Sequence, residues 1–292
     1  MSAEIYPAYR HSGKFGPHGP ALALIAAAVI GFPLGFAYSY LIKWIPLIYF
    51  NFLATLGYGA VFGWISGVFM KFGRVRNTSV AVLSGLFAGV IGLYLDWNGH
   101  LHALFKGAPL LSTPEIIVGA MKALYAQGSW GLRHGGNITG IPLAIVWAIE
   151  GATIIGLAAF VPYSMIAHTP FCEESQCWLD EEKKISTLEP FTDPALLALL
   201  RTGDLSPLTQ ARPKAPGATV FGRLVLKRSP RCNIFCTVRL QNVTLHTDKD
   251  GKTQEKLQDL TQDLMLPPSM FDLIAKFENF RPAPVPAGGV SS

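Results

Sequence analysis

Residues 20–41 read PALALIAAAVIGFPLGFAYSYL, and this apolar run determines the class of fold. A bilayer core about 30 Å thick is crossed by about 20 apolar residues in an α-helix. Three further runs are of the same kind: 46–70, 79–95, which is short, and 141–161. The sequence therefore predicts a mainly helical membrane protein. A leader at 1–19 precedes a domain of four transmembrane helices at 20–161.

Charge is distributed unevenly along the chain. Residues 20–161 contain three acids, which are Asp96, Glu115 and Glu150. Residues 162–292 contain 15 acids and 15 bases, so the formal net charge of +5 belongs to residues 1–161. Bases in loops beside apolar spans follow the charge rule for membrane topology. We therefore expect a lipid bilayer as the partner of this half, and the pattern argues against nucleic acid.

The loop after the second apolar run predicts the orientation. It contains Lys71, Arg74 and Arg76 and no acid. Because cytoplasmic loops carry an excess of Lys and Arg, we expect both termini in the cytosol and the connection at 96–140 outside. Thr113-Pro114-Glu115 has the features of a helix start within that connection. A helix of about 13 residues there is too short to span, so we expect it in the membrane interface.

Glycines recur at helical spacing in the second apolar run. Gly59, Gly63 and Gly67 are four residues apart and lie on one helix face. Small residues at this spacing let helices approach closely in lipid. The pattern predicts packing within the bundle, or a self-association face that would make a homo-oligomer.

Glu150 is the only acid inside the predicted spans. A charged carboxylate at mid-membrane costs about 2.5–3.5 kcal/mol on insertion scales, so it should face the bundle interior. Two interpretations remain open, namely a structural hydrogen bond and an ion-handling role. A second hypothesis concerns the outer connection, where His100 and His102 lie near Asp96 and could bind a metal with His134.

The chain from 162 to 281 predicts a small cytosolic α+β domain, and 282–292 is rich in Pro, Gly and Ser and predicted to be disordered. A charge run at 178–184 indicates a solvated segment. An apolar run of strand-forming residues predicts a strand at 219–226, and alternating apolar and polar residues predict an antiparallel strand at 236–245. A hairpin turn at 248–251 then leads to a third strand at 252–257. Helices are predicted at 195–201 and 269–280.

Four cysteines lie in this tail as two pairs, Cys172-x4-Cys177 and Cys232-x3-Cys236. Disulfides rarely persist in the cytosol, so close pairs indicate a structural metal. Two cysteine-bearing turns that converge on one ion form a zinc ribbon, and the tail resembles this arrangement. The resemblance implies one zinc ion held by four thiolates, with no open position for a substrate. Ordinary packed cysteines and reactive thiols are the alternatives.

Three bases lie beside the second cysteine pair, namely Lys227, Arg228 and Arg231. They could contact anionic lipid headgroups, or they could be solvated turn residues. The sequence contains no Gly-rich phosphate loop, no nucleophile elbow and no zinc-protease motif.

The sequence thus favours a non-enzymatic function. We expect an integral membrane scaffold or accessory subunit whose zinc-stapled tail docks a protein partner. One alternative is a small transporter or channel that uses Glu150. The other is a membrane enzyme with a metal site at the outer histidines.

Overall fold

The computed structural model describes residues 5–45, 47–105, 107–128 and 137–279. The described residues belong to two compact units, one drawn from Met1–His11 and Thr169–Ser292 and the other from Ser12–His168. The predicted disordered end at 282–292 lies outside the described residues. Each unit is treated by itself below.

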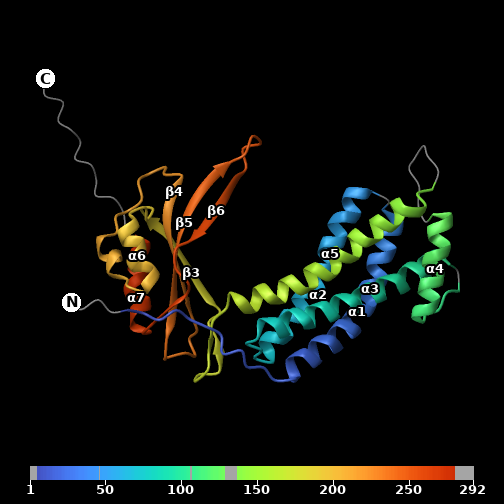
Figure 1. Ribbon diagram of the computed structural model, residues 1–292, viewed down its shortest axis with the longest axis horizontal. Helices are drawn as coiled ribbons and strands as arrows, with labels where there is room; N and C mark the ends of the chain where they lie inside the picture. Colours follow the sequence, from blue (N-terminus) through green and yellow to red (C-terminus); the bar gives the residue numbers. More distant parts are fainter. Residues whose placement is uncertain (1–4, 46, 106, 129–136, 280–292) are drawn as a thin grey trace. The chain divides into compact units, whose positions relative to one another are not determined.

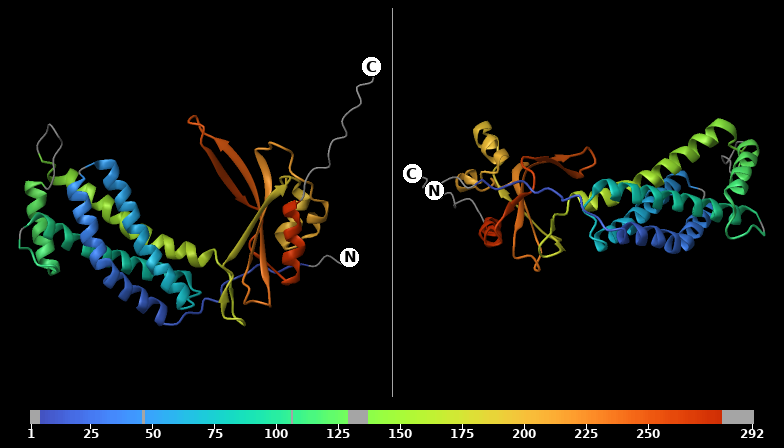
Figure 2. Two further views of the ribbon diagram at one scale, coloured as in Figure 1. Left: turned by 180° about the vertical axis from the view of Figure 1, so that it is seen from behind. Right: turned by 60° about the horizontal axis from the view of Figure 1, so that its bottom comes forward.

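The unit at Ser12–His168 is helical (Figure 1). Four of its helices are long and apolar enough to cross a membrane, which indicates a multi-pass membrane protein. A shorter helix, α4, lies beside the ends of α3 and α5 (Figure 2). The helices are α1 (His18–Trp44), α2 (Ile48–Phe72), α3 (Thr78–Leu104), α4 (Pro114–Gln127) and α5 (Gly140–Ala167).

Helix α3 is longer than predicted. The prediction ended the third span at residue 95, where the apolar run meets Asp96, but the helix continues to Leu104. Its start is fixed by Asn77, whose side chain accepts a hydrogen bond from the Val80 N–H. Asp96, Asn98 and Leu101 are buried in the last turns, so packing against other helices extends α3 beyond its apolar stretch. The predicted outer connection is shortened by the same amount.

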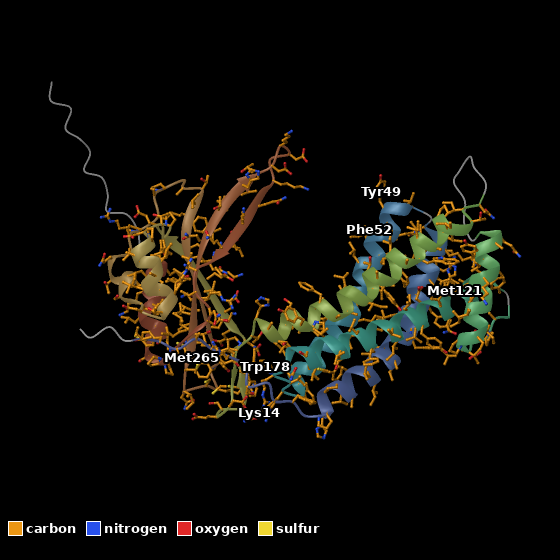
Figure 3. All side chains as sticks on the ribbon, in the orientation of Figure 1. Lys14, Tyr49, Phe52, Met121, Trp178 and Met265 are labelled. Carbon is orange, nitrogen blue, oxygen red and sulfur yellow. The ribbon has the colours of Figure 1, made fainter. Side chains whose placement is uncertain are left out.

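The four long helices pack tightly around a common core. Helix α3 contacts both α1 and α5, and α2 contacts α5. The core consists of small and aromatic side chains: Ala27, Tyr38, Tyr58, Phe62, Ala88, Ile154 and Ala158. Tyr49 and Phe52, at the start of α2, point away from the bundle and are 90% and 54% exposed (Figure 3). Exposed apolar side chains on an apolar helix fit a surface that faces lipid.

The other unit is built on an antiparallel sheet of five strands in the order β3-β4-β5-β6, with β7 paired to β5. A separate two-stranded ladder, β1 and β2, follows α5 in the chain. The strands are β1 (Phe171–Cys172), β2 (Cys177–Trp178), β3 (Glu181–Leu188), β4 (Val220–Arg228), β5 (Cys236–Thr247), β6 (Thr253–Asp259) and β7 (Leu264–Leu266). The prediction of a small antiparallel domain is therefore confirmed.

Helices cover one face of this sheet (Figures 1 and 2). They are α6 (Pro194–Thr202) and α7 (Ser269–Ala275), with the 3₁₀ turns η1 (Ser206–Gln210) and η2 (Lys276–Asn279). Leu224 and Leu226 of β4, and Val238 and Leu240 of β5, are fully buried in the core that these elements enclose. Strand β4 was predictable from its run of apolar, strand-forming residues, and β5 from its alternation of apolar and polar residues.

The charge run at 178–184 was interpreted as a solvated segment, and its charged side chains are exposed or half-buried. Its backbone comprises the last residue of β2, a two-residue connection and the first half of β3, which is the edge strand beside β4. Glu181 and Glu182 are exposed, as the charge pattern suggested, while Ile185 and Leu188 are buried in the core. Charged side chains on an edge strand prevent pairing with another chain.

The start of the chain belongs to the sheet unit. The backbone of Tyr6 donates to the Gly203 carbonyl at 2.9 Å, and Tyr9 donates to the Asp263 carbonyl at 2.7 Å. Met265 in turn donates to the Pro7 carbonyl at 2.9 Å. Gly203 has φ +89°, and a side chain there would collide with the Tyr6 backbone, so glycine is required where the N-terminal segment crosses. Both ends of the chain thus build one domain.

Candidate functional site

A buried cluster of polar side chains lies inside the helical unit, and Glu150 of α5 is one of its members. The Tyr38 hydroxyl of α1 donates to Glu150 Oε1 across 2.5 Å. The same hydroxyl is 2.7 Å from Thr55 Oγ1 of α2, and the Thr55 hydroxyl donates to the Asn51 carbonyl at 2.9 Å. Glu150 therefore faces the bundle interior, where three helices supply the hydrogen-bonded chain.

Asp96 is a second acid in the bundle, and the sequence prediction missed it. It lies in α3 and is 7% exposed. The Ser39 hydroxyl of α1 is 2.9 Å from Asp96 Oδ1. The prediction that Glu150 is the only acid within the spans is corrected here, because α3 continues past residue 95. The sequence signal was weak, because no proline lies between Asp96 and Gly107 but Asn98-Gly99 is a typical turn dipeptide.

These five residues, Tyr38, Ser39, Thr55, Asp96 and Glu150, are called the carboxylate cluster below. Within the described part of the chain, the two carboxylates contact hydroxyl groups and form no ion pair. In a low-dielectric bundle, two negative charges without a cation are costly, so the cluster is suited to holding protons or a cation.

An aromatic layer packs beside the cluster. The rings of Tyr38 and Tyr58 are stacked with centroids 4.4 Å apart. The Tyr58 hydroxyl donates to the Gly92 carbonyl of α3 at 2.9 Å, which satisfies its polar end. Phe62 meets Tyr58 edge-on at 5.0 Å. These rings link α1, α2 and α3 and hold the Tyr38 hydroxyl toward Glu150.

The structure places the three glycines of α2 against α5, the helix that carries Glu150. A Cβ atom on Gly59 would lie 2.9 Å from the Ile154 backbone, and one on Gly63 would lie 2.7 Å from the Leu157 carbonyl oxygen. One on Gly67 would collide with the Met165 side chain. The contacts of all three are thus within the chain, and they set how closely α2 approaches α5.

The outer histidines do not come together. Both lie in α3, where His102 Nδ1 is 2.9 Å from the Tyr40 hydroxyl of α1. The His100 ring instead meets the Trp97 ring edge-on at 5.7 Å. His134 lies outside the described residues. Over the described ranges, no group of three or more His, Cys, Asp and Glu residues is placed to hold a metal ion.

The four cysteines of the tail are divided between two apolar clusters. Cys172, Cys177 and Cys232 pack with Leu179 and Phe235. Cys236 lies in the main core, and its thiol donates to the Pro267 carbonyl at 3.5 Å. A zinc ribbon needs four thiolates around one ion, so this arrangement does not support the zinc-ribbon interpretation.

Cys236 is itself buried, and burial raises the pKa of its thiol to about 11. A structural zinc ion held by the four cysteines stays a prediction, which the zinc content per chain would test.

The three bases beside the second cysteine pair have different surroundings. Lys227 is buried, 3.7 Å from Asp263, and burial lowers its pKa. Arg228 pairs with Glu181 at 2.8 Å and lies over the Phe271 ring. Arg231 is exposed in the turn. A lipid contact by all three would require Lys227 to leave its buried position.

Comparison with protein-family models found no matching family, and comparison with curated proteins and with solved structures found no match.

Proposed function

We propose that the helical unit is a small transporter or channel that moves or uses protons, with Glu150 and Asp96 as the proton-binding groups. The observation that carries this proposal is the second carboxylate. One buried acid is weak support for an ion pathway, whereas two acids on different helices, each hydrogen-bonded to a hydroxyl of α1, offer two binding positions.

The neighbours of the two acids support a role for protons in particular. Each carboxylate is met by a hydroxyl, from Tyr38 or Ser39, and hydroxyls can donate or accept a hydrogen bond. A proton that arrives at either acid removes a charge from the low-dielectric interior. Protonation and deprotonation of the acids therefore change the hydrogen bonds of α1 to α3 and α5. A transporter needs such a link between ion binding and helix packing.

The test is proton flux into liposomes that contain the full-length protein and an internal pH-sensitive dye. A potassium diffusion potential provides the driving force. We expect Glu150→Gln and Asp96→Asn each to reduce the flux at least about tenfold, since neither amide can bind the proton. Glu115→Gln is the matched control, because Glu115 is exposed on α4. Flux that is unchanged in both variants would refute the proposal, provided that the variants elute as monodisperse protein.

A second candidate function is protein docking by the tail, and an apolar groove favours it. The groove has a volume of about 340 Å³ and lies between η1, α7 and η2. It is lined by Leu205, Leu208, Thr209, Met270, Leu273, Ile274, Lys276 and Phe277. We propose that it takes an apolar helix of a partner protein with an acidic residue near Lys276, since grooves of this kind bind amphipathic helices.

A photo-crosslinking residue at Leu273 tests this second candidate in native membranes. Leu273 lines the groove and is 52% exposed, and Leu257 on β6 is 51% exposed and lies outside the groove, so it is the matched control. We expect a discrete crosslinked adduct from position 273 and none from position 257. The adduct should disappear when Lys276→Glu is introduced as a second substitution. Equal adducts from both positions would contradict docking at the groove.

A further inference from the structure

The ladder of β1 and β2 places two cysteines directly opposite each other. Cys172 and Cys177 are register partners, and a turn of four residues joins them. Opposed residues of an antiparallel pair have Cα atoms about 4.5–5.5 Å apart. Disulfides form across Cα separations of about 4.4–6.8 Å. The backbone register thus already meets the main geometric condition for a disulfide.

We propose that Cys172 and Cys177 are a reversible disulfide site, oxidised by exchange with a small-molecule disulfide. The thiolate of one cysteine attacks a sulfur of the reagent disulfide and expels one reagent thiolate. The second cysteine thiolate then attacks the mixed disulfide, forms the Cys172–Cys177 bond and expels the other reagent thiolate. The two cysteines lose two electrons, the reagent gains them, and the two thiol protons end on the two reagent thiols.

The other two cysteines are less suited to this reaction. The Cys232 thiol packs in the same apolar cluster but donates to the Phe235 carbonyl at 3.4 Å, and it has no register partner among the paired strands. Cys236 is in the separate main core and bonded to Pro267.

The local structure also gives the reagent a way in. Cys172 and Cys177 are 1% and 7% exposed, so the closed hairpin shields them. However, the ladder contains only two residue pairs, and a short two-stranded ladder is an element of low local stability. Its turn includes exposed residues, and Gln176 adopts φ +51°, a conformation that non-glycine residues rarely hold. Opening this hairpin exposes both thiols together.

The experiment treats the purified full-length protein with oxidised glutathione, then alkylates the remaining thiols and maps the peptides by mass. We expect the number of alkylated cysteines to fall from four to two, with one linkage joining Cys172 to Cys177. Dithiothreitol should restore all four. Cys232→Ser is the matched control, since it removes a thiol of the same cluster and should leave the linkage unchanged.

Two results would overturn the proposal. One is a linkage that includes Cys232 or Cys236 in place of the assigned pair. The other is one equivalent of zinc per chain that protects all four cysteines from alkylation, which would restore the zinc interpretation. Cys177→Ser gives a second check, because Cys172 should then stop at a mixed disulfide with glutathione. This inference does not depend on the carboxylate cluster, so failure of the flux assay would leave it intact.

Discussion

Arg223 shows how a single residue can stabilise the sheet unit. It lies in β4, its side chain is 9% exposed, and its guanidinium donates to both carboxylate oxygens of Glu255 in β6, at 2.7 and 2.8 Å. A third hydrogen bond goes to the Ser186 hydroxyl of β3. One side chain thus joins three strands, and an unpaired charge would remain nearly buried if Glu255 were lost.

This pair predicts a pH dependence. The hydrogen bonds from Arg223 lower the pKa of Glu255 below its ordinary value of 4.5. A carboxylate whose pKa is lowered by folding stabilises the fold above its ordinary pKa and loses that contribution as the pH falls through the lowered value. We expect Glu255→Gln to weaken hydrogen-exchange protection of β4 and β6 by about 1 kcal/mol at pH 7, and the difference from the native protein to vanish at low pH.

The control for this prediction is Glu278→Gln. Glu278 pairs with Lys183 at 2.7 Å, but both side chains are more than a third exposed, at 55% and 36%. An exposed pair contributes little, so its loss should change protection by no more than about 0.5 kcal/mol. Equal effects of the two substitutions at pH 7 would show that the Arg223 pair has no special role.

At the scale of the element, the close approach of α2 to α5 depends on glycine. Gly63→Ala would place a Cβ atom 2.7 Å from the Leu157 carbonyl oxygen, so one helix must move. We expect a loss of about 2 kcal/mol in stability, measured as a lower Tm of the detergent-purified protein. Gly57 is in the same helix and a Cβ there meets nothing within 4 Å, so Gly57→Ala should leave Tm equal or higher.

The elements also show what could be read from the sequence. Helices α1, α2 and α5 were predictable because their apolar residues extend over the whole span. Strand β4 was predictable from an apolar, strand-forming run, and β5 from alternating apolar and polar residues. The end of α3 was not, since the polar Asp96 is stabilised by Ser39 of another helix. Strand β3 was missed because its first four residues are charged and only Ile185 and Leu188 are fully buried in the core.

Of the two acids in the carboxylate cluster, only one was predicted to lie within a span. Glu150 was recognisable as an acid in an apolar run, and the expectation that it faces the interior fits its contact with Tyr38. Its hydrogen-bond partner Tyr38 was not predicted, because that residue lies on another helix, 112 residues away in the chain. The cysteines are the opposite case. Their spacing in the sequence suggested one shared site, but Cys236 packs in the main core and the other three pack in a separate apolar cluster.

At the scale of the whole molecule, we expect the two ends of the chain to lie on one side of the membrane. Backbone hydrogen bonds join residues 6–9 to residues 203, 263 and 265, and four spans separate these segments. An even number of crossings returns the chain to its starting side. The side on which both ends lie stays a proposal. The basic loop with Lys71, Arg74 and Arg76 favours the cytosol.

The prediction is that epitope tags at the two termini respond alike to protease in sealed membrane vesicles. In inside-out vesicles we expect both tags to be removed, and in right-side-out vesicles both should be protected. Removal of one tag with protection of the other would contradict the shared domain. Detergent-opened vesicles provide the control, because both tags must then be cleaved.

The pairing of Tyr9 with Asp263 has a consequence for synthesis. The N-terminal segment leaves the ribosome first, yet its partner strand appears about 250 residues later, after every transmembrane helix. At about 5–20 residues per second, the wait is on the order of 10 to 50 s. During that time the apolar side of the segment, including Tyr6 and Ala8, has no core to enter. Insertion of the helices into the membrane therefore precedes completion of the domain, and nascent chains that stall before β7 should remain sensitive to proteolysis.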